Sequence, residues 1–294
     1  MTHRLLASRW VAGLFTACLL ALPALQAQAD AGALRARHAE LREQLRDNPY
    51  QRQLHIDSTE GSNTLQGDVY AVLDHPFDKV RDALKEPEAW CDIMLLPFNT
   101  KYCNANDDRL AVRIGRKYNQ PVEQAYKIDF QFRTSAASGD YLDSRLTAPQ
   151  GPVGTRDVRI RVEAVPLDNG KTFMHLSYAY GFGGLGRMAM QAYLSTAGAD
   201  KVGFSYAGKD ANGQPQYMGG VRGAIERNAM RYYLAIDSYL DSLSAPEAER
   251  VERRIQHWFS ATERYPRQLR EMDRATYVAM KRSEYERQQT AGLN

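Results

Sequence analysis

Apolar and polar residues alternate along six segments between Phe98 and Phe182. Successive strand side chains point to opposite faces of a sheet, so the alternation predicts strands with one covered face and one wet face. Turn-rich breaks such as Asp168-Asn-Gly170 separate most of the segments, and connections this short make neighbouring strands antiparallel. The clearest segment places on one face Val122, Gln124, Tyr126, Ile128, Phe130 and Phe132.

A long amphipathic helix is predicted from about Met218 to Ser244, with Asn228 in its apolar row. Two strands and two short helices precede the six segments. The first helix opens at Asp74-His75-Pro76, which is more typical of a helix cap than of a catalytic dyad. The order predicts an α+β fold: a curved antiparallel sheet wrapped around a long C-terminal helix. A helical C-terminal extension follows that helix.

Two further helical segments are predicted outside the sheet and the long helix: the C-terminal extension and an insertion before the long helix. Residues 247–287 carry ten Lys or Arg and eight Asp or Glu. They predict a charged helical extension over 245–294, solvated or in contact with anionic headgroups. A Met-rich helix is predicted at 185–198, either as one more packed helix or as a lid that touches a membrane surface. Its lid or hinge residues would be Gly183, Gly186, Met188 and Tyr193.

The N-terminus has the features of a bacterial secretory signal over 1–29. Arg4 and Arg9 precede an apolar stretch, and Ala27-Gln28-Ala29 favours cleavage after Ala29. A lipoprotein signal at Cys18 is the less favoured alternative. Secretion would place the mature chain in the periplasm or outside the cell. In an oxidising compartment Cys91 and Cys103 favour a disulfide over two buried free thiols.

Charge and motifs narrow the classes of function. The formal charge is +3, and it falls to +1 when Arg4 and Arg9 are removed, which gives no electrostatic reason for nucleic-acid binding. The glycine pattern from Gly181 to Gly186 follows an antiparallel strand, the wrong context for dinucleotide binding. No paired His or Cys spacing favours a metal, so neither a metal nor a cofactor is expected. No catalytic constellation is evident either, which favours a binder over an enzyme.

The chain resembles the START-like superfamily, also called the helix-grip or polyketide-cyclase/lipid-transfer fold. The resemblance covers roughly residues 50–244, within a predicted domain of 30–244. It is carried by the strand-to-helix entry at 69–80, by Trp90 before the next strand, and by residues 219–233 of the final helix. The insertion at 185–218 and the extension after Pro246 depart from the family order.

The resemblance implies an internal cavity between the concave sheet face and the C-terminal helix, used in the family for lipids, other apolar molecules or cyclase chemistry. We therefore expect periplasmic binding or transport of a lipid or another apolar small molecule. The alternatives are a cyclase or hydrolase in the same fold, and an envelope interaction module with a filled core. The expected ligand-binding residues are Trp90, Gln124, Tyr126, Ile128, Phe130, Tyr178, Tyr180, Arg222, Asn228 and Tyr232.

Overall fold

The computed structural model describes residues 27–196 and 198–291. Residues 1–26 of the predicted signal segment therefore lie outside the described residues. Within the described part, no helix is both long and apolar enough to span a bilayer.

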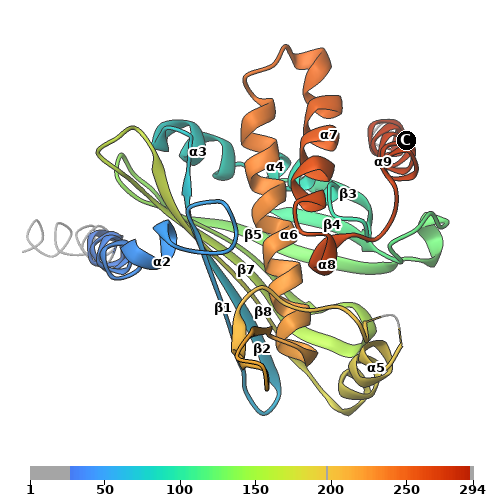
Figure 1. Ribbon diagram of the computed structural model, residues 1–294. Coiled ribbons are helices and arrows are strands. Elements are labelled where there is room, and N and C mark those ends of the chain that lie inside the picture. The colour runs from blue at the N-terminus through green and yellow to red at the C-terminus, as the bar shows by residue number, and fades with distance from the viewer. Residues whose placement is uncertain (1–26, 197, 292–294) are drawn as a thin grey trace, which may run out of the picture.

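The described chain forms one large antiparallel sheet and a separate small hairpin (Figure 1). All six predicted strands between Phe98 and Phe182 are present, and the two earlier strands extend the sheet. Its order is β1-β2-β8-β7-β6-β5-β4-β3, so β8, the last strand of this sheet in the chain, pairs with β2. The bounds are β1 Leu54–Glu60, β2 Thr64–Leu73, β3 Thr100–Asn106, β4 Arg109–Ile114, β5 Tyr126–Ala137, β6 Leu142–Gln150, β7 Thr155–Pro166 and β8 Thr172–Phe182; β9 Tyr206–Lys209 and β10 Pro215–Tyr217 form the hairpin.

Helices cover both faces of the sheet (Figure 1). The long helix α6 crosses one face, and α7 runs beside it. The other face is covered by the helical stretch 27–40 and α2, through Leu34, Leu41 and Leu45. The helices are α2 Arg42–Arg46, α3 Phe77–Leu84, α4 Pro87–Leu95, α5 Gly184–Leu194, α6 Gly220–Ser242, α7 Arg250–Glu263, α8 Pro266–Leu269 and α9 Arg274–Ala291, with short 3-10 turns η1 Val122–Gln124, η2 Pro152–Gly154 and η3 Glu247–Glu249.

Close contact between β2 and α6 depends on Gly67. A Cβ at this position would lie 3.2 Å from both the Cγ1 atom and the carbonyl oxygen of Ile225. Because glycine has no side chain, α6 packs directly against β2 at this position.

The helices after Pro246 belong to the main core. The indole of Trp258 stands 4.9 Å from the ring of Phe98 and 5.2 Å from that of Tyr277, centroid to centroid. Trp258 also donates a hydrogen bond to the carbonyl of Arg231 on α6. The extension is helical as predicted, but one of its sides is buried against α4, α6 and β3.

A disulfide joins Cys91 in the middle of α4 to Cys103 in β3, as the sequence predicted. It closes a loop across a sequence separation of 12 residues. The bond therefore fixes the second short helix to the first strand of the six-strand run.

Candidate functional site

Two adjoining chambers lie beside the first half of α6, where α5 (Figure 1) packs near the end of β8 and the start of β7. Both are lined by Thr155, Gly186 and Met190. We call the smaller one, of about 110 Å³, the apolar chamber. The larger one, of about 310 Å³, is the cationic chamber.

The apolar chamber owes its lining to strand alternation. Leu65 of β2 and Tyr180 and Phe182 of β8 point toward α6, because every second residue of a strand shares a face. Met190 of α5 and Val221 of α6 complete the apolar wall, and both are partly buried against the core. The chamber is therefore covered by the inserted helix on one side and by the grip on the other.

Three tyrosines meet next to this chamber. The ring of Tyr178 lies 5.7 Å from that of Tyr180 and 5.3 Å from that of Tyr232 on α6, centroid to centroid. Burial raises the pKa of Tyr180 and of Tyr232 to about 12, and that of Tyr178 well above its usual value. All three hydroxyls are therefore protonated near neutral pH and can donate. Within the described residues, none of the three makes a hydrogen bond.

The cationic chamber is lined by Lys117, Arg227 and Arg231 together with Asn99 and Asn228. Because Arg227 and Arg231 are four residues apart, one face of α6 presents both. Among the described residues that line this chamber, none is acidic.

Glu271 pairs with two of the cations that line this chamber. Its Oε1 atom lies 2.6 Å from Lys117 Nζ and 2.7 Å from Arg231 Nη2. Arg231 also donates to Asn228 Oδ1 over 3.3 Å. Arg227 donates to the backbone carbonyls of Lys201 and Val202 over 3.4 and 3.3 Å.

Glu226 fixes the insertion to the grip. Its carboxylate is fully buried and accepts hydrogen bonds from the backbone N–H groups of Phe204 and Ser205. It also accepts from the hydroxyls of Ser205 and Ser58, each over 2.6 Å. The chain entering β9 is therefore tied to both α6 and β1.

The structure brings together four of the predicted ligand-binding residues. Asn228 lines the cationic chamber and Tyr180 the apolar chamber, while Tyr178 and Tyr232 lie beside them. Predicted hinge residue Gly186 lines both chambers.

Other predicted ligand residues lie elsewhere. Gln124 and Tyr126 are on the surface, with Tyr126 53% exposed. Pro121 starts a 3-10 turn, so the strand begins only at Tyr126 and its first residues project beyond the covered face. Ile128 and Phe130 do face inward, but they are packed in the core.

Trp90 and Arg222 are likewise outside the chambers. Trp90 is fully buried and donates its indole N–H to the carbonyl of Leu84. Arg222 Nη2 donates to the carbonyl of Ser58 over 2.6 Å, and the Ser58 hydroxyl donates to Glu226. Arg222 therefore supports β1 rather than the cavity.

The predicted lid residues divide similarly. Met188 of α5 is 59% exposed and points away from the core. Gly183 precedes α5 and has open space around it. Tyr193 belongs to α5, but its side chain lies outside the described residues. Met190 is the methionine that enters the chambers, two residues beyond the predicted one.

Several lining residues were not predicted from the sequence: Lys117, Phe182, Met190, Val221, Arg227 and Arg231. For Arg227 and Arg231, the i, i+4 spacing beside the apolar row was an available signal. For Lys117 there was none, because it stands in an irregular connection after β4.

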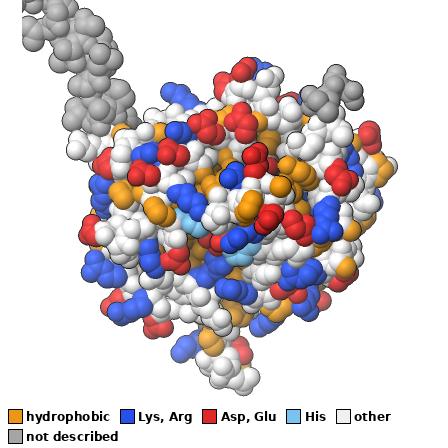
Figure 2. All heavy atoms as spheres, turned by 90° about the horizontal axis from the view of Figure 1, so that it is seen from above, with side chains coloured by type: hydrophobic (Ala, Val, Ile, Leu, Met, Phe, Trp, Pro, Cys, Tyr) orange, Lys and Arg blue, Asp and Glu red, His pale blue; other side chains and the backbone are white. Residues whose placement is uncertain are grey.

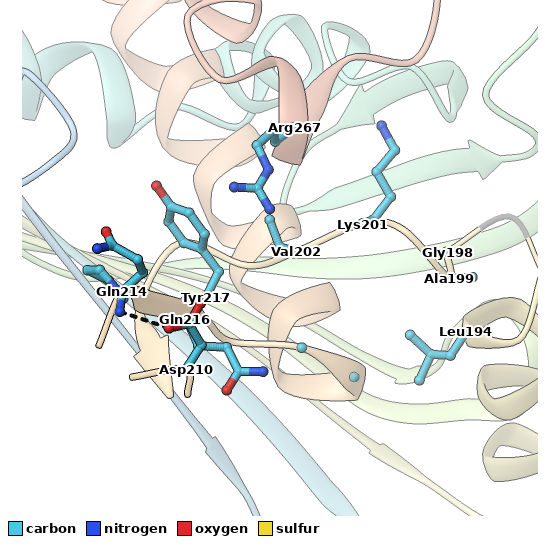
Figure 3. A pocket seen from close by; sticks show the side chains of 13 residues that line it. Leu194, Gly198, Ala199, Lys201, Val202, Asp210, Gln214, Gln216, Tyr217 and Arg267 are labelled. Atoms are coloured by element: carbon cyan, nitrogen blue, oxygen red, sulfur yellow. Dashed lines mark hydrogen bonds between the residues drawn. The ribbon is translucent and has the colours of Figure 1, made fainter. Parts of the chain in front are cut away.

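A wider hollow of about 630 Å³ lies outside the grip (Figure 3). It is formed by the β9–β10 hairpin, the chain around Lys201, and Arg267 of α8. Figure 3 shows Arg267 directed toward Tyr217, and the guanidinium carbon stands 5.3 Å from the ring centroid. This hollow is polar and open, and it belongs to the insertion rather than to the sheet and α6.

Charged and histidine side chains meet at the opposite end of α6, seen from above in Figure 2. His75 does not cap α3, whose N-cap residue is Pro76. Its Nε2 atom lies 3.9 Å from Asp237 of α6, and burial lowers the pKa of the imidazole. Within the described residues, no group of three His, Cys, Asp or Glu side chains could hold a metal ion.

The fold is the α+β helix-grip arrangement that the sequence predicted: an antiparallel sheet wraps α6. No protein-family model matches the chain, and no curated protein matches it. Three solved structures with similar architecture show how distant the likeness is.

Human StAR-related lipid transfer protein 5 is 12% identical, with 58% of this chain and 89% of that chain covered and a TM-score of 0.30. Norcoclaurine synthase from Thalictrum flavum is 13% identical, with 48% and 87% covered and a TM-score of 0.32. A conserved protein from Geobacillus kaustophilus is 11% identical, with 60% and 95% covered and a TM-score of 0.33. At these identities and TM-scores, none of the three assigns a ligand to this chain.

Proposed function

We propose that this protein binds a lipid or another small apolar or amphipathic molecule between the sheet and α6. The observation that carries the proposal is the tyrosine trio. The hydroxyls of Tyr178, Tyr180 and Tyr232 make no hydrogen bond within the described residues, and none of them is among the fully buried polar atoms that lack a partner. They are therefore accessible to a small molecule, and a tyrosine hydroxyl can both donate and accept. A ligand, or water that the ligand displaces, would supply hydrogen-bond partners beside an apolar chamber.

Exposed apolar side chains at the entrance support ligand exchange at a membrane surface, as part of the same proposal. Met188 projects outward from α5, and Val153 of the neighbouring η2 is 48% exposed. Val153 has a φ of 55°, a conformation that β-branched residues rarely adopt. Co-sedimentation with liposomes tests this. A Met188→Ser, Val153→Ser double variant should sediment less, and unchanged sedimentation would argue against membrane contact.

An envelope location is also part of the proposal. It is supported by the signal-like N-terminus and by the Cys91–Cys103 disulfide, a bond typical of oxidising compartments. Expression of the full chain in a Gram-negative host followed by mass spectrometry of the periplasmic fraction provides the test. The expected species begins at Asp30 and has no free thiol. A full-length cytosolic chain with three alkylatable cysteines would contradict the location.

Binding is tested with N-phenyl-1-naphthylamine, a neutral apolar dye whose fluorescence rises in apolar surroundings. We expect saturable binding to the purified protein. Val221→Trp should abolish it, because the larger side chain fills the apolar chamber from the first turn of α6. Val122→Trp, at a part-exposed position outside both chambers, serves as the matched control. No saturable binding, or equal binding by both variants, would refute the proposal.

A further inference from the structure

We propose that the outer face of the sheet, opposite α6, docks on a lipid bilayer that carries anionic headgroups. Five arginines of β4 to β7 make the contact, and we call them the arginine face: Arg109, Arg133, Arg145, Arg159 and Arg161. This inference rests on the membrane contact in the proposed function. It adds the surface that makes the contact and the charge of the lipid that the surface selects.

Strand register brings these arginines together. Arg133, Arg145 and Arg161 lie directly opposite one another on β5, β6 and β7. In the neighbouring row Arg109 and Arg159 lie at the two ends, with two uncharged residues between them. Buried residues that face inward precede or follow each of the five in its strand, so the arginine side chains share the outer face.

The arginine face is unfavourable for the fold taken alone. Like charges directly opposite each other on neighbouring strands destabilise a sheet. Asp143 compensates two of them, because its Oδ2 atom lies 2.9 Å from Arg161 Nη2 and also pairs with Arg145. The other three, Arg109, Arg133 and Arg159, are exposed, and their side chains make no ion pair or hydrogen bond within the described residues. An external anionic surface would offset the repulsion that remains.

The position of the arginine face favours an extended partner over a small anion. The face lies on the side of the sheet away from α6, and none of its arginines lines either chamber or the wider hollow. The helical stretch 27–40 and α2 cover this side of the sheet elsewhere, over Tyr70, Tyr141 and Phe173. The arginine face is thus an open surface, which suits an array of anionic groups.

Exposed apolar side chains at the edge of the same strands favour a bilayer over a soluble polyanion. Tyr126 begins β5, Val153 of η2 precedes β7, and both side chains are exposed. The turn η2 also contacts β5. Tyrosine is enriched where bilayers meet water, and basic together with exposed apolar side chains are typical of interfacial binding. A soluble polyanion would leave Tyr126 and Val153 in water.

Co-sedimentation with two kinds of vesicle tests the inference. One consists of phosphatidylcholine alone, and the other is an equimolar mixture of phosphatidylcholine and phosphatidylglycerol. We expect the purified protein to bind the mixed vesicles about tenfold more tightly or better, since each arginine near an anionic surface strengthens binding roughly fivefold. Added salt should reduce the difference, because ions screen charges at an exposed surface.

A double variant, Arg133→Gln with Arg159→Gln, tests the residues, because glutamine removes the charge and remains polar. It should bind the mixed vesicles about 10- to 30-fold more weakly, whereas Arg133→Lys with Arg159→Lys should keep most of the binding. The matched control is Arg42→Gln with Arg46→Gln, two exposed positions of α2, a helix that contacts β1 and β2. This control should bind like the parent protein. Thermal melting checks that all three variants are folded.

The outcomes distinguish this inference from the proposed function. Equal binding to both vesicles would overturn the anionic selection and leave membrane contact standing. Equal binding by the glutamine variant and its control would overturn the assignment to the arginine face, and loss of binding in the lysine variant would show that charge is not the cause. Retention on heparin-agarose without vesicle binding would assign the face to a soluble polyanion and overturn the bilayer. Sedimentation with neither vesicle would overturn both this inference and the membrane contact, while failed dye binding would overturn the ligand site alone.

Discussion

Replacement of Lys281 by methionine should change how stability depends on pH. Lys281 of α9 is 1% exposed and forms a buried triad with Lys101 of β3 and Glu284. Its ammonium group donates to the carbonyls of Pro97 and Thr100 and lies 2.7 Å from Glu284 Oε2. One carboxylate therefore faces two lysines in a site without water contact, and the triad carries an excess positive charge when both are protonated.

The magnitude follows from the pKa of Lys281. Burial, opposed in part by Glu284, lowers it from 10.5 to about 8. This corresponds to roughly 3 kcal/mol of unfavourable interaction with the charged form. Between pH 8 and 10.5 the unfolded chain keeps this proton and the folded chain does not. The free energy of unfolding therefore rises with pH in that window, by roughly 1.4 kcal/mol per pH unit.

Urea unfolding at pH 7 to 9.5 measures the effect as the difference between the parent protein and Lys281→Met, in which contributions from most other groups cancel. Below pH 8 the difference should be constant. Between pH 8 and 9.5 it should change by roughly 2 kcal/mol in favour of the parent protein. Lys127→Met, at an exposed position, should give a profile parallel to that of the parent. Parallel profiles for Lys281→Met would refute the reasoning, because they would mean that Lys281 stays protonated throughout.

Three further predictions concern the framework around the site. Glu226→Ala should lower the free energy of unfolding by roughly 3–5 kcal/mol, because four donors lose a buried acceptor. It should also expose residues 198–219 to proteolysis. A loss of stability as small as that of Glu249→Ala, at an exposed position, would contradict this. Gly67→Val should cost about 1–3 kcal/mol in urea unfolding by forcing β2 away from α6. Gly139→Val, where a Cβ meets open space, is its control, and equal stability of the two would argue against close packing. Replacing Cys91 and Cys103 together by alanine should cost about 3 kcal/mol by releasing the loop that the disulfide closes; if reduction of the parent protein leaves its unfolding midpoint unchanged, the bond does not stabilise the fold.

The strands and the long helix could be predicted because their signals are local. Alternation in β8 placed Tyr178 and Tyr180 toward α6, and the structure has both there. The same signal was wrong at Gln124, where alternation continues through residues that fold as a 3-10 turn after Pro121. A periodic pattern shows which side chains share a face only where the backbone is extended, and the sequence pattern does not mark the point at which the strand begins.

The extension shows a different limit. Its charges predicted a solvated helix, yet Lys281 and Glu284 are buried because Lys101, about 180 residues earlier in the chain, lies opposite them. Counting charges along one segment cannot reveal a partner from another segment. The aromatic residues of the extension, Trp258 and Tyr277, were the available signal for a packed helix, since large apolar side chains seldom remain fully solvated.

The apolar residues that line the chambers could be predicted better than the charged ones, because strand periodicity is local whereas charge pairing depends on distant segments. Tyr180 reaches its place through strand periodicity, so its inward direction is fixed locally. Arg231 lies beside the apolar row of α6. It lines a chamber because α5 and the connection that carries Lys117 lie opposite this side of the helix. Glu271, which belongs to the C-terminal extension, pairs with both Lys117 and Arg231. The charge of the site is thus assembled from three separate segments.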